Sequence, residues 1–356
     1  MKSKGLFSVA AVFIAMALLA GCGKTAATNT ASTANTAGVS TTGGSDSTSA
    51  TVATGEKKLK KITVAYAGGT CEAPAFVAYH NGIFKEEGLD VNFVQMGFED
   101  LKSGLASGKV SGTVGNFAWF KPIEQGLQIK ITGGLHAGCI NAVAPPDSGI
   151  ASIADLKGKT IGVDAIGGGP MIILSIELKK KGIDPKTDVQ WKAYPPAQLE
   201  AAIDKKEIQA FIVWDPFGAD LVKNKKYVQL LGNGSDEPYK SGYCCYSVVS
   251  NKLVENDPEA AAAFTRAVLR AAEWVGLHTR EAAQLEVDQK YVAISVDEDE
   301  EFIKQYVWKP GVKDAAKDVK FFIEQTKDQG ILDPSTDVNE LFKNAFYYAI
   351  PDYNGK

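Results

Sequence analysis

Short apolar runs alternate with amphipathic stretches from Leu59 to about Gly242, and this alternation constrains the fold more than any other feature of the sequence. The apolar runs have the length of strands, and the stretches between them have the length of helices. Strands that alternate with helices form largely parallel sheets covered by helices, so the sequence predicts an α/β fold. The expected strands lie at 60–69, 89–97, 111–118, 129–138, 140–146, 159–167, 189–194, 208–217 and 227–234.

The expected helices carry helix start and stop residues. In the segment 72–88, Pro74 suits the first turn of a helix and Gly88 suits its end. Asp257 is a candidate N-cap, with Pro258 at the first helical position. Beyond Gly242 the pattern becomes helical. The expected helices lie at 72–88, 98–110, 119–127, 152–158, 171–182, 195–207, 217–224, 257–280, 279–291, 297–308, 313–330 and 336–350.

The first 58 residues differ in composition from the rest of the chain. Lys2 and Lys4 precede the apolar stretch 6–20, which has the length of a signal-peptide core and is short for a membrane span. Residues 23–56 are almost entirely Thr, Ala, Ser, Gly and Asn, and such a segment buries too little apolar surface to offset its ordering entropy. The sequence predicts a signal peptide at 1–21 and a flexible tether at 22–58.

The charge balance argues against a nucleic-acid partner. The chain has 38 basic and 42 acidic residues, a net charge of −4, and removal of Lys2 and Lys4 with the signal peptide makes it −6. Both signs are mixed along the chain, with no basic patch of the kind that nucleic acid requires. A body of about 300 residues is long enough for two lobes, each with its own core.

Two resemblances to known families follow from motifs. Leu19-Ala20-Gly21-Cys22 resembles the lipobox of bacterial lipoproteins, which implies cleavage before Cys22 and a diacylglycerol, palmitate-type anchor on its thiol. The body resembles the periplasmic substrate-binding proteins of ABC importers, in the nitrate/sulfonate/taurine and thiamine-pyrimidine group. The motifs are APAFVAYHNGIFKEEGLDV, SGLASGKVSGTVGN, IADLKGKTIGV and AQLEAAIDKKEIQAFIVWDPF, in which Ser111, Lys206 and Gln209 depart from the pattern of the group.

The second resemblance implies a two-lobed fold of the type II periplasmic-binding-protein class. Lobe one would comprise 59–143 and 245–356, and lobe two 144–244, with the chain crossing between them near Ala142–Pro145 and Tyr243–Val248. The resemblance implies a monomeric receptor, not an enzyme, that captures a small organic or anionic solute of the sulfonate, nitrate or pyrimidine-precursor class. Its partners would be an ABC permease with its ATPase subunits. It would lie outside the cytoplasm, held at the cell membrane by lipid alone.

Candidate ligand-binding residues lie in the loops that follow the expected strands. Ligands of parallel α/β sheets bind at the carboxyl ends of strands, where loops and helix N-termini converge. Aromatic rings there can stack on a ligand or pack in the core, and the carboxylates can pair with a cationic group or cap helices. The candidates are Thr70, Cys71, Glu72, Asn116, Phe117, Trp119, His136, Cys139, Gly168, Gly169, Trp214, Asp215 and Cys244.

Gly167-Gly168-Gly169-Pro170 lacks the spacing of a nucleotide-binding loop, although it can offer backbone N–H groups to an anion. Sulfonate and nitrate binders typically carry a hydroxyl residue at this position, so the glycines weaken that ligand assignment. No catalytic motif emerges, and no cofactor or dedicated metal site is expected. Two alternatives stay open: a receptor for a metal ion or metal chelate that uses the Cys and His loops, and a cysteine-dependent enzyme.

The segment 241–250 carries two adjacent cysteines, Cys244 and Cys245. If this segment is extended, successive side chains point to opposite faces, so the two thiols cannot both face a cleft. The prediction is that Cys244 faces Cys71 or Cys139 at the cleft while its neighbour packs in the core. Buried filler, a soft ligand or metal contact, and a disulfide all remain possible roles for these thiols.

Overall fold

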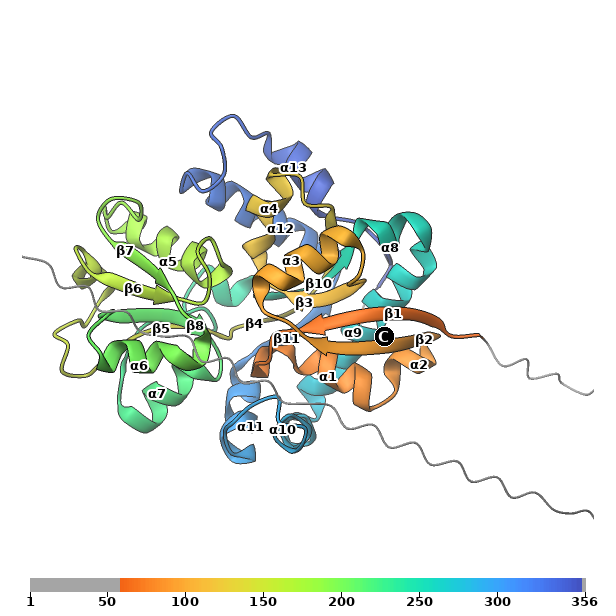
Figure 1. Cartoon of the computed structure of the whole chain (residues 1–356), viewed down its shortest axis with the longest axis horizontal. Helices are drawn as coiled ribbons and strands as arrows, with labels where there is room; N and C mark the ends of the chain where they lie inside the picture. Colours follow the sequence, from red (N-terminus) through yellow and green to blue (C-terminus); the bar gives the residue numbers. More distant parts are fainter. Residues whose placement is uncertain (1–57, 354–356) are drawn as a thin grey trace, which may run out of the picture. The chain divides into compact units, whose positions relative to one another are not determined.

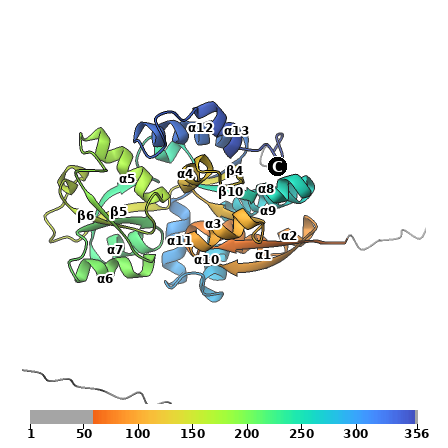
Figure 2. The same cartoon turned by 45° about the horizontal axis from the view of Figure 1, so that its top comes forward.

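The computed structural model describes residues 58–353, and the predicted signal peptide, Cys22 and nearly all of the predicted tether lie outside this range. The described chain forms two mixed sheets with flanking helices, drawn in Figures 1 and 2. The six-stranded sheet has the order β11-β4-β10-β3-β1-β2 and consists of β1 (Lys60–Tyr66), β2 (Leu89–Gln95), β3 (Gly112–Gly115), β4 (Ile129–Ala137), β10 (Cys245–Ser250) and β11 (Val307–Gly311). The five-stranded sheet has the order β7-β6-β8-β5-β9 and consists of β5 (Ile140–Ala144), β6 (Thr160–Val163), β7 (Gln190–Ala193), β8 (Ala210–Trp214) and β9 (Val228–Gly232).

The predicted α/β class is confirmed. The sheets are mixed because β10 and the edge strand β11 in one sheet, and β5 in the other, run antiparallel to the strands they pair with. β10 pairs antiparallel with β3 and β4, and β5 pairs antiparallel with β8 and β9. β10 lies inside its sheet, and all six of its residues are buried, which explains its nearly continuous run of apolar and small side chains.

The chain passes between the sheets twice. It leaves the six-stranded sheet at Ala137 and enters the five-stranded sheet at Ile140, so the first passage is Gly138–Cys139 and lies earlier than the predicted 142–145. The return runs through residues 233–244 to β10. Each passage therefore delivers a cysteine to the boundary between the sheets.

Helices cover both sheets. Three belong to the middle of the chain: α5 (Gly169–Lys180), α6 (Leu199–Asp204) and α7 (Phe217–Lys225). The others are α1 (Ala73–His80), α2 (Ile83–Glu86), α3 (Phe98–Ser107), α4 (Phe120–Glu124), α8 (Asn251–Asn256), α9 (Pro258–Leu277), α10 (Thr279–Asp288), α11 (Val296–Gln305), α12 (Lys313–Asp328) and α13 (Val338–Ala345). α9 packs on α1 and β11, α10 packs on α11, and α13 packs on α12 and α4, as Figures 1 and 2 show.

Local sequence explains several element ends and two departures from the expected elements. The Asp257 carboxylate accepts a hydrogen bond from the Ala260 N–H at 3.0 Å, which confirms the predicted N-cap of α9. The expected helix 72–88 is two helices, because Gly82 adopts the left-handed conformation at φ 77°. The strand β11 was missed, since its residues continue the helical pattern of 297–308 and include Pro310 at a sheet edge. Among residues 58–353, no helix is long and apolar enough to cross a membrane.

Candidate ligand-binding site

A cavity of about 1050 Å³ lies between the two sheets. Its walls come from the loops after β1, β2 and β3 of the six-stranded sheet and after β6, β7 and β8 of the five-stranded sheet. These loops gather at one place because the carboxyl ends of parallel strands share one edge of a sheet, and the two edges face each other. The loop 290–294 that follows α10 closes a further part of the wall.

Aromatic side chains form much of the lining. Trp119 and Trp214 contribute from opposite sheets, and Phe98, Tyr194 and Tyr291 add further rings. The Trp119 ring packs 5.1 Å from that of Phe98 and is almost fully buried. Large rings on facing walls suit a flat or apolar ligand, which can stack on one ring and be covered by another.

The charged side chains of the lining are mostly acidic. Glu72, Asp164, Glu200 and Asp220 line the cavity, and Lys290 is the basic residue among the described lining residues. Asp164 is half-buried, and its Oδ1 atom is buried without a hydrogen-bond partner within the described chain. Burial raises the pKa of Asp164 to about 7. This lining favours a neutral or cationic ligand over an anion.

The structure brings six of the thirteen predicted residues to the cavity: Cys71, Glu72, Asn116, Trp119, Cys139 and Trp214. Asn116 also caps the turn at Phe117–Trp119, since its Oδ1 accepts from the Ala118 N–H at 2.9 Å. Asn116 therefore both lines the cavity and closes this turn.

Glu72 stabilises the turn after β1. Its carboxylate accepts hydrogen bonds from the N–H groups of Ala67, at 3.0 Å, and Gly68, at 2.6 Å. Burial raises the pKa of Glu72 to about 8, which the two backbone donors oppose. From the sequence, Glu72 could cap a helix or pair with a cationic group. The structure adds a third role, since its carboxylate accepts hydrogen bonds from the backbone of the loop after β1.

Asp215 lies behind the cavity wall. Its Oδ1 accepts from Asn141 Nδ2 at 2.7 Å, and its Oδ2 accepts from the Tyr306 hydroxyl at 2.9 Å. Burial raises the pKa of Asp215 to about 8, while the Tyr306 hydrogen bond opposes the shift. Tyr306 precedes β11 and Asp215 follows β8, so this carboxyl group links the two sheets.

His136 and Thr70 are fully buried behind Cys71. The Nε2 atom of His136 lies 3.0 Å from the carbonyl oxygen of Cys71, and the imidazole ring stacks on Tyr306 at 4.9 Å. The Thr70 hydroxyl donates to Asp299 Oδ1 at 2.6 Å. Both side chains position the loop that carries Cys71 and do not line the cavity.

Four other predicted residues lie outside the cavity lining: Phe117, Gly168, Gly169 and Cys244. Phe117 is fully buried and stacks on Phe322 at 4.4 Å. Gly168 and Gly169 lie outside the lining, and a Cβ atom on Gly169 would meet the Asn116 side chain at 2.5 Å, so this glycine permits close contact between the two sheets. Cys245 lines the cavity where Cys244 was expected.

The four cysteines of the described chain gather at the boundary between the sheets, and all are buried. Cys139 Sγ lies 2.9 Å from Cys244 Sγ and 4.0 Å from Cys245 Sγ. The sulfur atoms of Cys71, Cys139 and Cys245 all lie within 4.8 Å of one another. Hydrogen bonds from Cys139 and Cys245 hold the pKa of Cys71 well below the usual range of a thiol.

The loop 290–294 contributes lining residues that the sequence did not suggest. Tyr291 stacks on Phe76 at 3.8 Å and meets Tyr66 edge-on at 5.2 Å, which fixes the loop against the end of β1. The sequence placed Tyr291 at the end of a helix, far from any expected strand. The sequence offered one signal for this loop, an aromatic residue just beyond the end of a helix. That signal alone does not indicate that the residue lines a cavity.

The fold and the cavity together define a solute-binding protein of the periplasmic type. Residues 120–287 match the family model described as the NMT1-like family. The nitrate/nitrite binding protein NrtA of Nostoc sp. is 24% identical over 83% of this chain and 71% of its own length. A Bacillus subtilis protein whose name proposes aliphatic sulfonates as its ligand is 27% identical over 96% of this chain and 95% of its own length.

Solved structures show the same fold. The periplasmic nitrate-binding protein NrtA from Synechocystis PCC 6803 superposes with a TM-score of 0.70 at 16% identity, over 82% of this chain and 87% of that chain. The alkanesulfonate-binding protein SsuA from Xanthomonas axonopodis pv. citri, bound to MOPS, superposes with a TM-score of 0.67 at 15% identity. The match covers 79% of this chain and 97% of that chain. The chain is therefore a homologue of the nitrate- and sulfonate-binding proteins, and its relatives are binding proteins of ABC import systems, not enzymes.

Proposed function

We propose that this protein is the solute receptor of an ABC importer and captures a small molecule in the cavity between its two sheets. The observation that carries the proposal is the cavity itself, which both sheets line from the carboxyl ends of their strands. The sheets are joined by two chain passages, at Gly138–Cys139 and 233–244, which can act as a hinge. A ligand that contacts both walls stabilises the closed arrangement and so drives closure.

The lining supports a flat organic solute, neutral or cationic, as the ligand. Sulfonate and nitrate carry full negative charge, and a buried anion needs positive or N–H partners. Here four carboxyl groups and one lysine line the cavity, and the N-terminal residues of α5 lie outside its lining. Facing tryptophans instead offer stacking surfaces on both walls. Within the solute classes of the family, the pyrimidine-precursor type fits this lining better than the oxyanions.

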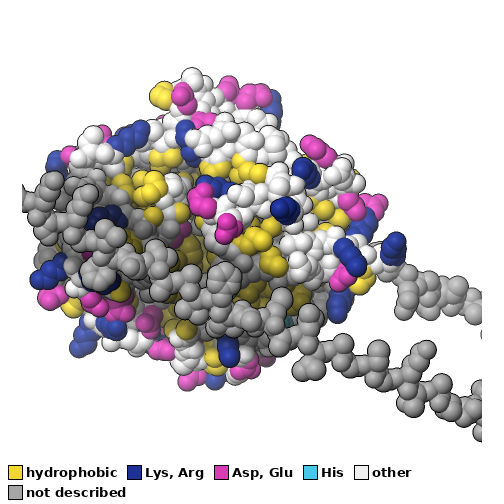
Figure 3. Space-filling model, viewed as in Figure 1, with side chains coloured by type: hydrophobic (Ala, Val, Ile, Leu, Met, Phe, Trp, Pro, Cys, Tyr) yellow, Lys and Arg dark blue, Asp and Glu magenta, His cyan; other side chains and the backbone are white. Residues whose placement is uncertain are grey.

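The membrane anchor and the partners are part of the same proposal. Cleavage before Cys22 and lipidation of its thiol would tether the folded part outside the cytoplasm through the segment 22–58. Loops and helices of both lobes would dock on the permease, whose ATPase subunits power import. Figure 3 shows basic and acidic side chains intermixed on the face that it displays, as on an ordinary solvated surface. Cell fractionation tests the anchor: Cys22→Ser should move the protein from the membrane fraction to the soluble fraction.

Mass spectrometry of the small molecules released from gently purified protein tests the receptor function. The expected result is a stoichiometric organic solute that raises the melting temperature when it is added back. A thermal-shift screen that includes nitrate, taurine and alkanesulfonates serves as the comparison, and these anions should produce no shift. A protein that releases nothing and responds to no solute in a broad screen would contradict the receptor assignment.

A second candidate ligand is a metal ion or a metal chelate. The observation that favours it is the set of three cysteine sulfur atoms at the cavity wall. A cysteine-dependent enzyme has less support, because the His136 ring faces the Cys71 carbonyl oxygen and stacks on Tyr306, and the relatives are binding proteins.

A further inference from the structure

Three cysteines from distant parts of the sequence converge on one point of the cavity wall. Cys71 lies in the turn after β1, Cys139 in the first passage between the sheets, and Cys245 at the start of β10. All three line the cavity, and their exposed fractions are 7%, 4% and 4%. We propose that Cys71, Cys139 and Cys245 form a three-thiolate site for a soft metal ion, with a further coordination position open to the cavity.

The sulfur spacing suits such an ion. A metal bonded to three thiolates at about 2.3 Å holds their sulfur atoms about 3.8 to 4.0 Å apart. The Cys139 and Cys245 sulfur atoms are 4.0 Å apart, and all three pairs are within 4.8 Å. Contraction of less than 1 Å therefore brings the set to bonding geometry.

The backbone at Cys139 is a second, independent observation. Its φ is 113°, a value at which non-glycine residues are rare, and it follows Gly138 at φ 86°. Glycine would occupy this position without strain, yet the residue is a cysteine whose side chain reaches the other thiols. Strained backbone of this kind concentrates at functional sites, where the surrounding structure holds it in place.

The ligand set selects the class of metal. Thiolates favour Cu(I), Zn²⁺ and the similarly soft Cd²⁺, whereas Mg²⁺ and Ca²⁺ prefer oxygen ligands. Three protein ligands leave a position for water or for a group of an incoming molecule. The carboxyl groups of Glu200 and Asp220 in the lining add a potential that attracts cations. A role for the metal as cargo rests on the proposed receptor function, whereas metal binding itself does not.

Cys244 is excluded from this set and competes with it. Its backbone N–H donates to the carbonyl oxygen of His136 at 2.8 Å, and its side chain lies outside the cavity lining. Its sulfur atom is nevertheless 2.9 Å from that of Cys139. Exchange with an external disulfide, which takes up the two electrons and two protons and leaves as two thiols, would join this pair and remove one of the three ligands. Metal binding and a Cys139–Cys244 disulfide are therefore mutually exclusive states.

Cadmium titration of the full chain tests the site. All proteins carry Cys22→Ser, which removes the one other cysteine, and are kept reduced, chelator-treated and free of oxygen. The thiolate-to-cadmium charge-transfer absorbance should rise linearly to one equivalent of Cd²⁺, with an amplitude typical of three thiolates. Cys71→Ser, Cys139→Ser and Cys245→Ser should each weaken binding by at least about tenfold, measured against a chromophoric chelator.

Cys244→Ser is the matched control, because it removes a buried thiol of the same cluster and should change the affinity by less than about threefold. Thermal melts of every variant show whether it is folded. Where a variant is unfolded, the titration of the Cys22→Ser parent still tests whether the site binds Cd²⁺. Absence of the charge-transfer band in the parent overturns the site, as does a Cys244→Ser variant that binds as weakly as the other three. A count of two free thiols in the parent isolated anaerobically and without added reductant also overturns it, because two of its four cysteines would then form a resident disulfide.

These outcomes separate the metal site from the receptor function. A protein that binds no Cd²⁺ but releases a stoichiometric organic solute retains the receptor function without the metal site. A protein that binds Cd²⁺ but responds to no organic solute retains the metal site, and Cu(I) and Zn²⁺ then become the ions to compete against Cd²⁺.

Discussion

Gly69 lies where the loop after β1 meets the loop after β8. Its φ of −174° is extended backbone that any residue adopts, so its own chain tolerates a side chain. A Cβ atom there would lie 2.9 Å from the backbone oxygen of Asp215 and 2.9 Å from Trp214 Cδ1, which lie in the loop after β8 and at the end of β8. We expect Gly69→Ala to hold the sheets apart, leaving the protein folded while weakening solute binding by about tenfold or more.

Gly97 provides the control for this substitution. It also lines the cavity, its φ is −72°, and a Cβ atom on it would have no neighbour within 4 Å. Isothermal titration with the solute recovered from the purified protein should give nearly native affinity for Gly97→Ala. Equal affinities of Gly69→Ala and Gly97→Ala would show that closure does not require the contact at Gly69.

Trp214 is the lining ring contributed by the end of β8. Its replacement by leucine removes a stacking surface while keeping an apolar side chain, and such a ring contributes about 1 kcal/mol or more to binding. We expect Trp214→Leu to weaken solute binding by roughly five- to tenfold. Trp191→Leu is the control, since Trp191 lies in β7, outside the lining, and donates to the Pro185 carbonyl oxygen. Equal losses of affinity in the two variants would contradict a role for the Trp214 ring.

At the residue scale, the sequence predicted which loops supply the site better than it predicted which of their side chains point into the cavity. Loops after strands were identified correctly, and six of their residues line the cavity. The choice between Cys244 and Cys245 failed because alternation along a strand can be used only when its register is known. β10 begins at Cys245 with a register shift before Tyr246, and an irregularity of this kind leaves no mark on the sequence pattern.

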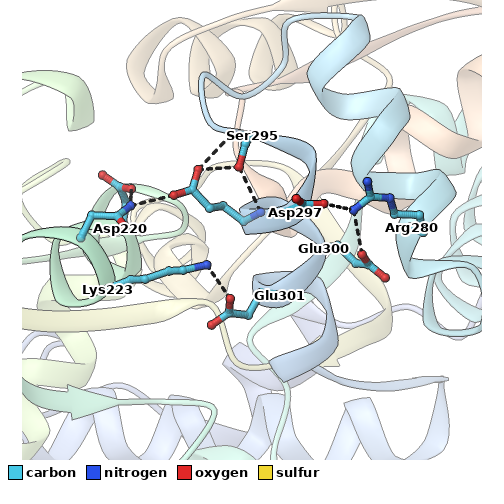
Figure 4. Close-up of polar contacts among 9 residues, drawn as sticks. Asp220, Lys223, Arg280, Ser295, Asp297, Glu300 and Glu301 are labelled. Atoms are coloured by element: carbon cyan, nitrogen blue, oxygen red, sulfur yellow. Dashed lines mark hydrogen bonds and ion pairs between the residues drawn. The ribbon is translucent and has the colours of Figure 1, made fainter.

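At the scale of elements, α7 and α11 connect the two sheets outside the cavity. α7 follows a strand of the five-stranded sheet, and α11 packs on α10 and the turn after β1. Lys223 forms an ion pair with Glu301 (Figure 4), and Asn224 Nδ2 donates to Glu298 Oε1 at 2.8 Å. Ser295 is the N-cap of α11 and forms a capping box with Glu298, in which each side chain accepts a hydrogen bond from the other residue's backbone N–H. The Ser295 hydroxyl also donates to the Glu298 carboxylate, so the start of α11 holds this carboxylate in place.

The contacts between α7 and α11 should contribute modestly to closure. We expect Lys223→Ala combined with Asn224→Ala to weaken solute binding about two- to fivefold at low salt, because exposed ion pairs contribute up to about 1 kcal/mol. The difference in affinity between the double variant and the parent should shrink at high salt, because salt screens the charges. Lys343→Ala is the control, since Lys343 pairs with Glu340 within α13. A loss of affinity that persists undiminished at high salt would argue against an electrostatic contact.

Elements with their own local signals were predictable from the sequence. Periodicity and caps located α9 and the strands β1 to β9, because their burial pattern follows their own sequence. β11 was not predictable, since its pairing with β4 depends on a contact between residues more than 160 positions apart. The role of the loop 290–294 in the cavity was hidden for the same reason.

At the scale of the whole molecule, several carboxyl groups are buried or half-buried in the fold. Burial raises the pKa of Asp164 to about 7, of Asp215 to about 8 and of Asp318 to about 6. The unfolded chain releases these protons near pH 4, whereas the folded protein keeps them to higher pH. Between those values the folded state binds more protons, so the free energy of unfolding falls as the pH rises and levels off above the folded pKa values.

We therefore expect the metal-free, solute-free protein to be more stable at pH 5 than at pH 8. Each pKa unit corresponds to about 1.4 kcal/mol, and three such groups should lower the melting temperature by at least about 5 °C over this interval. His80 and Cys71 act in the opposite sense, since burial lowers the pKa of His80 and hydrogen bonds from Cys139 and Cys245 lower that of Cys71. Glu72, whose pKa burial raises to about 8, adds to the expected fall in stability. Calorimetric melts across the pH range measure the slope.

Asp164→Asn isolates one contribution to this slope. The amide cannot ionise, so the variant should lose less stability than the parent between pH 5 and pH 8, and should melt higher than the parent at pH 8. Asp100→Asn, on the exposed surface of α3, should keep the slope of the parent. A melting temperature that rises from pH 5 to pH 8, or an Asp164→Asn slope equal to that of Asp100→Asn, would mean that Asp164 is ionised in the folded protein. In that case the cavity would present a permanent negative charge at Asp164, and a cationic solute or metal ion would be the ligand that stabilises it.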